Sequence, residues 1–462
     1  MNPYLVAVLA IILCSHLLEQ AAALLNLRSL DPELPSEFRD VFDRHRYARS
    51  QEYTRVTTRF AMVRDAVLTL LTLGFILAHG FNALDSLARQ PGLPPMATGL
   101  LFIGLLLLLS GLVNLPFSAY ATFVIEERFG FNRTSIRTFC GDILKSVLLA
   151  ILLGTPLLAA VLWLFERGGA MAWLYCWGVL ALFVVVVQFL APVVIMPLFN
   201  RFTPLEDGPL RQMILDYVRK EGTPVRDIHT MDGSKRSTRA NAFFTGLGRF
   251  RRIVFFDTLL ARLSPHEILA VLAHEMGHLR LHHLPRMMGA TLLQMGFMLY
   301  LLSLCIDNRL LFDAFGMEHL SIYASLVFFG FLYAPLSLLV SVALHHVARH
   351  HEFQADSYAV RTTGLGDALI SGLKKLAAAN LANLTPHPFA VALHYSHPPI
   401  LERIRAIRRL ESAQAGESGQ KRPEVCALCG RQQDGASLRW DGQQGYLCPD
   451  CLDEVAACGC ED

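Results

Sequence analysis

Charged residues are scarce in this chain of 462 residues, of which Asp, Glu, Lys and Arg together make up only 17%. Soluble domains carry roughly 25%. Disordered chains combine low hydrophobicity with high charge, so disorder is excluded and an ordinary soluble domain is disfavoured. Only six of the 41 basic residues are lysines, and no basic stripe with interleaved aromatic residues appears. We therefore expect no nucleic-acid partner.

The first apolar run also lacks a basic residue in front of it, because the first such residue is Arg28. A secretory signal peptide opens with positive charge, so we expect this run to stay in the protein as a membrane span. Hydrophobic residues make up 53% of the chain, and about 20 helical residues cross a bilayer. The sequence predicts seven membrane helices, at residues 3–26, 61–84, 97–121, 143–165, 171–199, 286–305 and 320–343.

Arginine is distributed unevenly among the loops between these spans. Residues 27–60 carry seven arginines, whereas the second, fourth and sixth loops hold one each, Arg89, Arg167 and Arg309. Basic residues mark cytoplasmic loops. We therefore expect a multi-pass integral membrane protein with its N-terminus outside and its C-terminal part in the cytoplasm.

The long segment after the fifth span is predicted to mix helices and strands. We expect an amphipathic helix at 209–221, strands at 227–231 and 252–256, and a helix that starts at Ser264, where Ser, Pro and Glu form a helix-start signal. Later residues predict helix at 349–378, loop at 379–399 and helix at 400–412. The expected domains are membrane helices at 1–199, a metalloprotease core at 200–412, a linker at 413–424 and a small module at 425–462.

The helix after Ser264 contains His274-Glu275-Met276-Gly277-His278, an H-E-x-x-H motif. Because residues four apart share one helix face, His274 and His278 are expected to bind one catalytic Zn²⁺, with Glu275 as general base and acid. Zinc needs an open coordination position for water and lowers the pKa of that water to about 7.

A catalytic zinc site normally has three protein ligands, so a third must come from elsewhere in the chain. Our candidate is Glu352, and Asp356, one helical turn later, could orient a zinc-bound histidine. Other donors flank the membrane helices, and for each of them a solvated or interfacial position is favoured. These competing residues are His282, His283, His345, His346, His350 and His351.

Several separated motifs, spread over roughly residues 1–410, give this sequence a specific resemblance. Besides the H-E-x-x-H motif and Glu352-x-x-x-Asp356, they are Tyr53, Glu126-Glu127-Arg128-Phe129-Gly130-Phe131-Asn132, Asn241-Ala242-Phe243-Phe244, Ser396-His397-Pro398 and Leu401-Glu402-Arg403. Together they resemble the type I CAAX prenyl proteases, which are seven-span integral-membrane metallopeptidases of the gluzincin type.

This resemblance implies a mainly α-helical polytopic fold in which seven spans enclose a chamber beside a gluzincin-like zinc domain. It also implies removal of the C-terminal tripeptide from a prenylated protein. In the family, residues that match Asn241, His397 and Arg403 line the cleft and hold the substrate backbone, and the histidine also supports the tetrahedral intermediate. From the residues alone, Asn241 could equally be a turn residue and His397 a helix cap.

The C-terminal tail carries a second motif. Cys426 and Cys429, separated by an 18-residue gap from Cys448 and Cys451, match a structural four-thiolate zinc ribbon. A redox pair is the alternative, and Cys458 and Cys460 stay unassigned. The family core does not require this module, which could recruit a protein partner, regulate access or stabilise the tail.

The leading hypothesis is a membrane-embedded zinc metalloendopeptidase that acts at the cytoplasmic membrane face on peptides or lipidated proteins. One alternative is a heat-shock-type quality-control membrane metalloprotease, which resembles a chain with fewer spans. The other is a non-catalytic metal-binding scaffold or transporter. The seven predicted spans favour the leading hypothesis over the first alternative, and the intact Glu275 argues against the second.

Overall fold

The computed structural model describes residues 2–223, 227–245, 252–418, 438–440 and 446–451. Within these ranges, seven helical segments are long and apolar enough to cross a membrane, which confirms the predicted number of spans. They are Pro3–Arg28, Arg44–Leu77, Pro95–Glu126, Ile136–Arg167, Gly169–Phe199, His283–Cys305 and Ile322–Thr363. At most 17% of the apolar window of each segment is buried inside the protein, which leaves a large apolar surface that lipid can cover.

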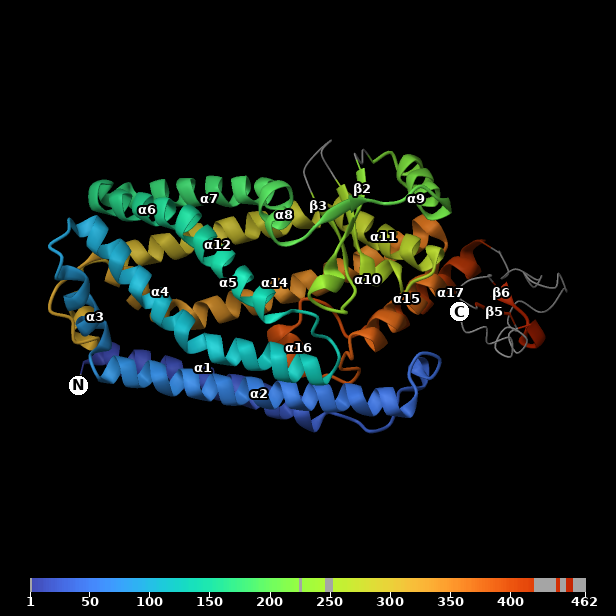
Figure 1. The fold of residues 1–462 in the computed structure, drawn as a ribbon, viewed down its shortest axis with the longest axis horizontal. Coiled ribbons are helices and arrows are strands. Elements are labelled where there is room, and N and C mark those ends of the chain that lie inside the picture. The colour runs from blue at the N-terminus through green and yellow to red at the C-terminus, as the bar shows by residue number, and fades with distance from the viewer. Residues whose placement is uncertain (1, 224–226, 246–251, 419–437, 441–445, 452–462) are drawn as a thin grey trace.

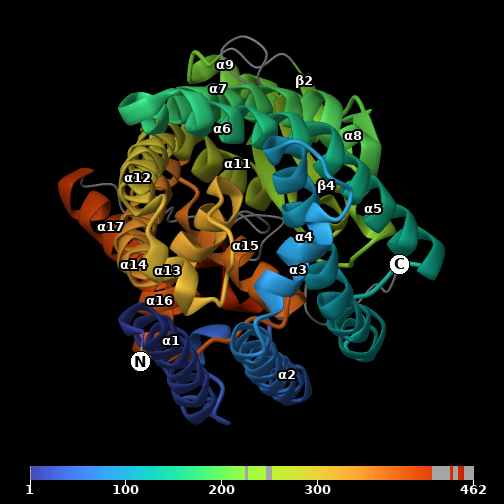
Figure 2. The same cartoon turned by 90° about the vertical axis from the view of Figure 1, so that its left-hand side faces the viewer.

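Several of these segments consist of more than one labelled helix in Figure 1. The helices are α1 (Pro3–Arg28), α2 (Arg44–Leu77), α4 (Pro95–Tyr120), α5 (Ile136–Leu149), α6 (Thr155–Arg167), α7 (Ala172–Leu190), α8 (Met196–Phe199), α12 (His283–Cys305) and α14 (Ile322–Thr363). Short π-helical turns continue α4, α5 and α7, the last being Ala191–Ile195. Figure 2 looks along the helices and shows a ring, with α6 and α7 opposite α1 and α2. Helices α12 and α14 form one side of this ring, and α4 and α5 form the other.

Several predicted helix boundaries were wrong. The second span was expected at 61–84, but α2 ends at Leu77 and a separate α3 covers Gly80–Arg89. The helix expected at 349–378 is divided by Gly364, whose φ of +69° ends α14 before α15 (Gly366–Ala379) begins. Glycine adopts this left-handed conformation without steric cost.

The other boundary errors lie nearer the C-terminus. The loop expected at 379–399 contains a short helix, α16 (Pro388–His394). It begins with Pro388, a residue that suits the first position of a helix. Helix α17 (Ile400–Ser418) runs six residues beyond the expected end at 412, into the proposed linker. The remaining membrane-side helix, α13 (Arg309–Ala314), follows α12.

A small sheet lies at one end of the membrane helices, with strand order β1-β2-β4-β3. The strands are β1 (Phe202–Pro204), β2 (Asp227–Met231), β3 (Ala242–Thr245) and β4 (Arg252–Phe256). The predicted strands at 227–231 and 252–256 are therefore correct, and they pair in parallel. Strand β3 lies at an edge of the described sheet and pairs antiparallel with β4.

Four helices pack with this sheet around one hydrophobic core that includes Ile253, Phe255, Ile268, Leu272 and Ile404. They are α9 (Pro209–Lys220), α10 (Asp257–Leu260), α11 (Pro265–Arg280) and α15, and α17 joins them from the C-terminal side. In the tail, two short strands, β5 (Arg439–Trp440) and β6 (Tyr446–Leu447), pair antiparallel.

The predicted start of α11 is confirmed. The Ser264 side chain accepts from the backbone N–H of Glu267, and the Glu267 carboxylate accepts from the backbone N–H of Ser264. Glu267 is fully buried, and it also binds Lys375 and Ser371 of α15. The capping box therefore fixes both the beginning of α11 and the position of α15 beside it.

Candidate metallopeptidase site

Close packing of α11 on α14 builds the centre of the site. Gly277 makes this possible, because a Cβ atom at that position would lie 2.9 Å from the Ala355 Cα atom, closer than real Cβ contacts allow. Gly277 belongs to the H-E-x-x-H motif, and Ala355 lies between Glu352 and Asp356. The same contact therefore brings the H-E-x-x-H motif and the Glu352-x-x-x-Asp356 motif, more than 70 residues apart in the sequence, face to face.

Three donor groups converge there, and they are the three expected from the sequence. Donor atoms of His274, His278 and Glu352 all lie within 4.8 Å of one another. Glu352 Oε1 lies 3.2 Å from His278 Nε2, and Glu352 Oε2 lies 3.5 Å from His274 Nε2. Two imidazoles and one carboxylate are a donor set that zinc proteases use.

Asp356 determines which nitrogen of His274 faces the other donors. His274 Nδ1 lies 2.8 Å from Asp356 Oδ1. Because a carboxylate only accepts, Nδ1 carries the ring proton and donates a hydrogen bond to Asp356. Nε2 is then left with a lone pair that points to His278 and Glu352. Arg403 holds Asp356 with two hydrogen bonds, of 2.8 and 2.6 Å, and its Nη1 atom lies 3.2 Å from Glu352 Oε2.

A corresponding hydrogen-bond chain orients His278 through His283, for which the sequence favours a solvated or interfacial position. His283 is buried, with Nδ1 3.0 Å from His278 Nδ1 and Nε2 3.0 Å from the Gln354 side-chain oxygen. An amide oxygen only accepts, so His283 Nε2 donates to it and His283 Nδ1 accepts from His278 Nδ1. His278 Nε2 then also carries no proton, and its lone pair is available to a metal ion. The signal in the sequence was the position of His283 just after the motif, but nothing there distinguished it from His282.

The arrangement fits a metal cation. The two bare Nε2 atoms of His274 and His278 lie 3.2 Å apart, and with both Nδ1 atoms protonated they have no proton to share. The buried Glu352 Oε2 atom has no hydrogen-bond partner among the described residues, although it forms an ion pair with the Arg403 guanidinium 3.2 Å away. Lone pairs and a carboxylate crowded together without protons repel one another unless a cation lies between them.

A cavity of about 160 Å³ adjoins these donors. Glu275 lines it, and burial raises the pKa of the Glu275 carboxyl above its ordinary value. A raised pKa suits a carboxylate that must take up and release a proton. Its apolar lining includes Leu259, Val271, Leu369, Leu373 and Leu376.

The other expected site residues also line this cavity. His397 Nε2 lies 3.3 Å from Glu352 Oε1, and its ring bonds the Ser396 hydroxyl through Nδ1. Asn241 is exposed at the start of edge strand β3, and its side-chain oxygen accepts from the backbone N–H of Ala242. Arg403 is buried beneath the donors, bound to the two carboxylates already described. Residues of β3, α10, α11, α14, α15 and α17 thus meet around one cavity.

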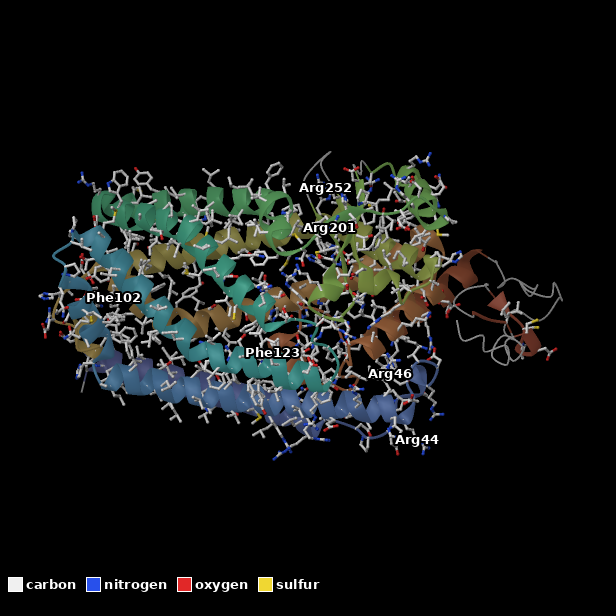
Figure 3. The ribbon with its side chains drawn as sticks, in the orientation of Figure 1. Arg44, Arg46, Phe102, Phe123, Arg201 and Arg252 are labelled. Atoms are coloured by element: carbon white, nitrogen blue, oxygen red, sulfur yellow. The ribbon has the colours of Figure 1, made fainter. Side chains whose placement is uncertain are left out.

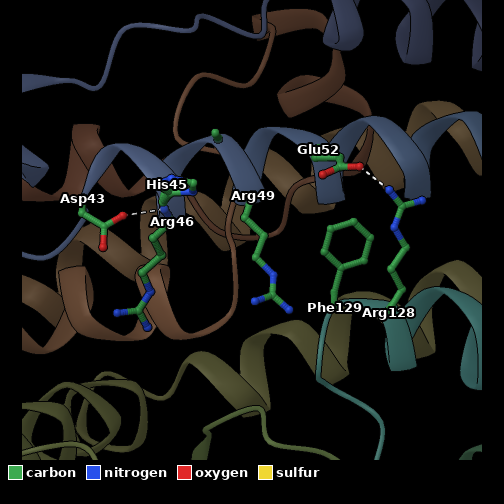
Figure 4. Close-up of a pocket in the computed structure, with 8 residues that line it drawn as sticks. Asp43, His45, Arg46, Arg49, Glu52, Arg128 and Phe129 are labelled. Carbon is green, nitrogen blue, oxygen red and sulfur yellow. Dashed lines mark hydrogen bonds and ion pairs between the residues drawn. The ribbon is translucent and has the colours of Figure 1, made fainter.

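The remaining resemblance motifs meet beside β3. The Tyr53 hydroxyl donates to Glu126 Oε1 at 2.6 Å, and Arg239, two residues before Asn241, binds the same carboxylate at 3.0 Å. Phe129 packs on the Tyr53 ring. Figure 4 shows the adjoining part of α2, where Glu52 pairs with Arg128 beside the Phe129 ring. Membrane helices are therefore joined directly to the segment that carries Asn241.

The tail motif is described in part. Cys426 and Cys429 lie outside the described residues, as do Cys458 and Cys460. Cys448 and Cys451 are both buried, directly after β6, in a small cluster with Leu438 and Leu447.

Sequence profiles identify the family. The profile described as CAAX prenyl protease N-terminal, five membrane helices, matches residues 24–201, and that of peptidase family M48 matches residues 204–411. The chain belongs to peptidase family M48. It is an integral multi-pass membrane zinc metallopeptidase, and the site described above lies in the part that the peptidase profile covers.

Individual M48 relatives extend over most of this peptidase. A CAAX prenyl protease 1 homolog of Oryza sativa is 34% identical over 89% of this chain and 98% of its own length. CAAX prenyl protease 1 of Saccharomyces cerevisiae is also 34% identical, over 82% of this chain and 89% of its own. The crystal structure of S. mikatae Ste24p superposes with a TM-score of 0.84 at 32% identity, covering 88% of this chain and 99% of that one.

Proposed function

We propose that this M48 peptidase cleaves peptide bonds near the C-terminus of prenylated proteins, as the names of its relatives indicate for them. The observation that carries the proposal is the convergence of His274, His278 and Glu352 beside the Glu275 carboxylate, at a cavity that is partly lined by leucines. The match of the five-helix N-terminal profile favours this function over membrane quality control.

In the proposed mechanism, His274, His278 and Glu352 hold the zinc ion. Bound zinc would polarise the scissile carbonyl and make the attacking water more acidic. Glu275 removes a proton from that water as its oxygen attacks the carbonyl carbon, and then gives the proton to the amide nitrogen as the C–N bond breaks. The products are a carboxylate and a free amine.

Further residues are assigned to positioning and charge. Asp356 and His283 keep the two imidazole lone pairs directed at the metal. His397 is suitably placed to donate a hydrogen bond to the developing oxyanion, since its Nε2 atom already lies 3.3 Å from a ligand oxygen of Glu352. Arg403, which we had expected to bind substrate directly, has its donors occupied by Asp356 and Glu352, and we propose that it acts by holding both carboxylates.

The substrate is proposed to bind as an extended strand. Strand β3 is at the edge of the described sheet, and an exposed edge can pair with an added strand through main-chain hydrogen bonds. Asn241 at its start would bind the peptide backbone. The leucines that line the cavity suit aliphatic side chains next to the cleaved bond, and the membrane helices supply the apolar surroundings that a prenyl group needs.

The topology and the tail complete the proposal. The arginine-rich loops support an N-terminus outside and an active site and C-terminus in the cytoplasm. We divide the chain into membrane helices (1–199), metalloprotease core (200–412), linker (413–424) and tail (425–462). Because α17 ends at Ser418, the non-helical part of the linker begins after that residue. A structural zinc ion bound by Cys426, Cys429, Cys448 and Cys451, and a protein partner bound through the tail, are part of this proposal.

The deciding experiment compares two peptides on the purified enzyme. Wild type and Glu275→Gln are incubated with a farnesylated CAAX peptide and with its unlipidated twin, with and without a zinc chelator. We expect chelator-sensitive cleavage of the farnesylated peptide by wild type only. Equal rates on both peptides would contradict prenyl specificity, and full activity of Glu275→Gln would contradict the mechanism.

A further inference from the structure

A second cavity, of about 630 Å³, lies where the membrane helices meet the sheet. Its lining includes four basic side chains, Lys145 of α5, Arg201, Lys235 and Arg252 of β4, and a single carboxylate, Asp232. None of these residues lines the catalytic cavity. Figure 3 labels Arg201 and Arg252, which lie near each other where α8 joins the sheet.

Positive charge in this cavity is largely uncompensated. Within the described part of the chain, the side chains of Arg201, Lys235 and Arg252 form no ion pair or hydrogen bond. Asp232 is partly occupied, because its Oδ1 atom accepts from the Arg201 backbone N–H at 2.6 Å. Several cations facing one space without counter-charges repel one another, and a bound anion would relieve that repulsion.

Lys145 does not change this balance. Its Nζ atom donates to the Leu198 carbonyl at 2.9 Å and lies 3.7 Å from Asp142. That carboxylate is already held by Arg236 through bonds of 2.7 and 3.0 Å. Lys145 therefore shares the Asp142 carboxylate with Arg236, so that two cations face one carboxylate, and Lys145 lines the cavity as its fourth basic residue.

The cavity borders exposed apolar surface. Leu198 lines it and is 47% exposed, and Val193 and Val194, in the π-helical turn before α8, are 53% and 50% exposed. These residues end a membrane segment whose exposed faces must lie against acyl chains. A cluster of cations directly beyond such a surface lies at the depth of lipid headgroups.

We propose that this cavity binds the phosphate group of an anionic phospholipid, whose acyl chains lie along the exposed apolar ends of α5 and α8. Arg201, Lys235 and Arg252 bind the phosphate from the sheet side and Lys145 binds it from the membrane side. The bound lipid joins the sheet, through β1 and β4, to the bilayer. Since β4 also pairs with edge strand β3, the lipid holds the peptidase core at a fixed height above the membrane.

The test measures lipid selectivity rather than activity. The full chain in detergent is titrated with phosphatidylglycerol and with phosphatidylcholine of the same acyl chains, and bound lipids are counted by native mass spectrometry. We expect wild type to prefer phosphatidylglycerol. Arg201→Gln/Arg252→Gln should weaken its binding about 25-fold, since each basic residue near an anionic surface contributes about 1 kcal/mol, or about 5-fold.

A matched control removes the same charge elsewhere. Arg211→Gln/Arg219→Gln takes two arginines from α9, where they pair with Asp207 and Asp216, and should leave lipid selectivity unchanged. Lys235→Glu changes one exposed side chain and provides an independent variant with little risk to folding. For it we expect at least the 5-fold loss that removal of one charge causes. Zinc content and melting temperature report that each variant is folded.

A competition arm separates a lipid from a free anion. Inorganic phosphate is added to wild type with phosphatidylglycerol bound, and we expect it to displace no lipid, because it lacks the acyl chains. Displacement by phosphate would mean a site for a soluble anion and would overturn the proposal. Unchanged selectivity in both the double variant and Lys235→Glu would overturn it as well.

Discussion

Replacing His283 by Phe tests the hydrogen-bond chain behind the second zinc ligand. His283 is 3% exposed and stacks on His351, with ring centres 3.9 Å apart and an interplanar angle of 7°. Phenylalanine preserves that stacking but removes the acceptor for His278 Nδ1. The variant therefore isolates the hydrogen bond from the packing.

The expected effect follows from the geometry. His278 Nδ1–H loses its partner in a mostly buried position, which costs about 1–3 kcal/mol and allows the ring to rotate or change tautomer. This range corresponds to roughly 5- to 150-fold weaker zinc binding, in agreement with the ~10–100-fold found when outer partners of metal ligands are removed. We expect a central value near 30-fold.

Zinc competition with a chromogenic chelator measures this loss. It is done on the full chain with Cys426→Ser and Cys429→Ser, so that only the core site titrates. His346→Phe is the control, because His346 is exposed on the same helix as His351 and should change nothing. An affinity equal to wild type in His283→Phe would refute the hydrogen-bond chain, whatever the activity.

Three further predictions concern the same core and the tail. Glu352→Gln should lower bound zinc from about two to one per chain, measured by elemental analysis; retention of both would contradict its role as a ligand. Gly277→Ala should destabilise the protein by about 1–3 kcal/mol and weaken zinc binding, because the new Cβ separates α11 from α14; an unchanged melting temperature and zinc affinity would mean that the contact is unimportant. A chain ending after Ser418, where α17 ends, should keep its peptidase rate, and loss of that rate would assign the tail a catalytic role.

Long-period patterns made much of the fold predictable. Seven apolar runs of bilayer length identified the spans, because a helix in lipid must satisfy its backbone within its own segment. The start of α11 was equally accessible, since Ser264 and Glu267 act over a single turn. Helix boundaries that depend on a single residue were not predictable, as the division of the expected 349–378 helix at Gly364 illustrates.

The candidate ligands were predictable for a related reason. His274 and His278 lie on one helix face by spacing alone, and Glu352 with Asp356 repeats that spacing on a second helix. Their distance from each other was not encoded locally, because it depends on how closely α11 approaches α14 at Gly277. The resemblance to a known family supplied that pairing before the coordinates did.

By itself, therefore, the sequence determined the membrane spans, the helix-borne histidine pair and the chemical type of its third partner. Only the tertiary structure decided that Arg403 holds carboxylates, that His283 rather than its neighbours orients a ligand, and that four cations from four separate segments surround one cavity. The reason is physical: periodicity and capping act between residues a few positions apart, whereas hydrogen-bond partners and charge clusters depend on which distant surfaces pack together.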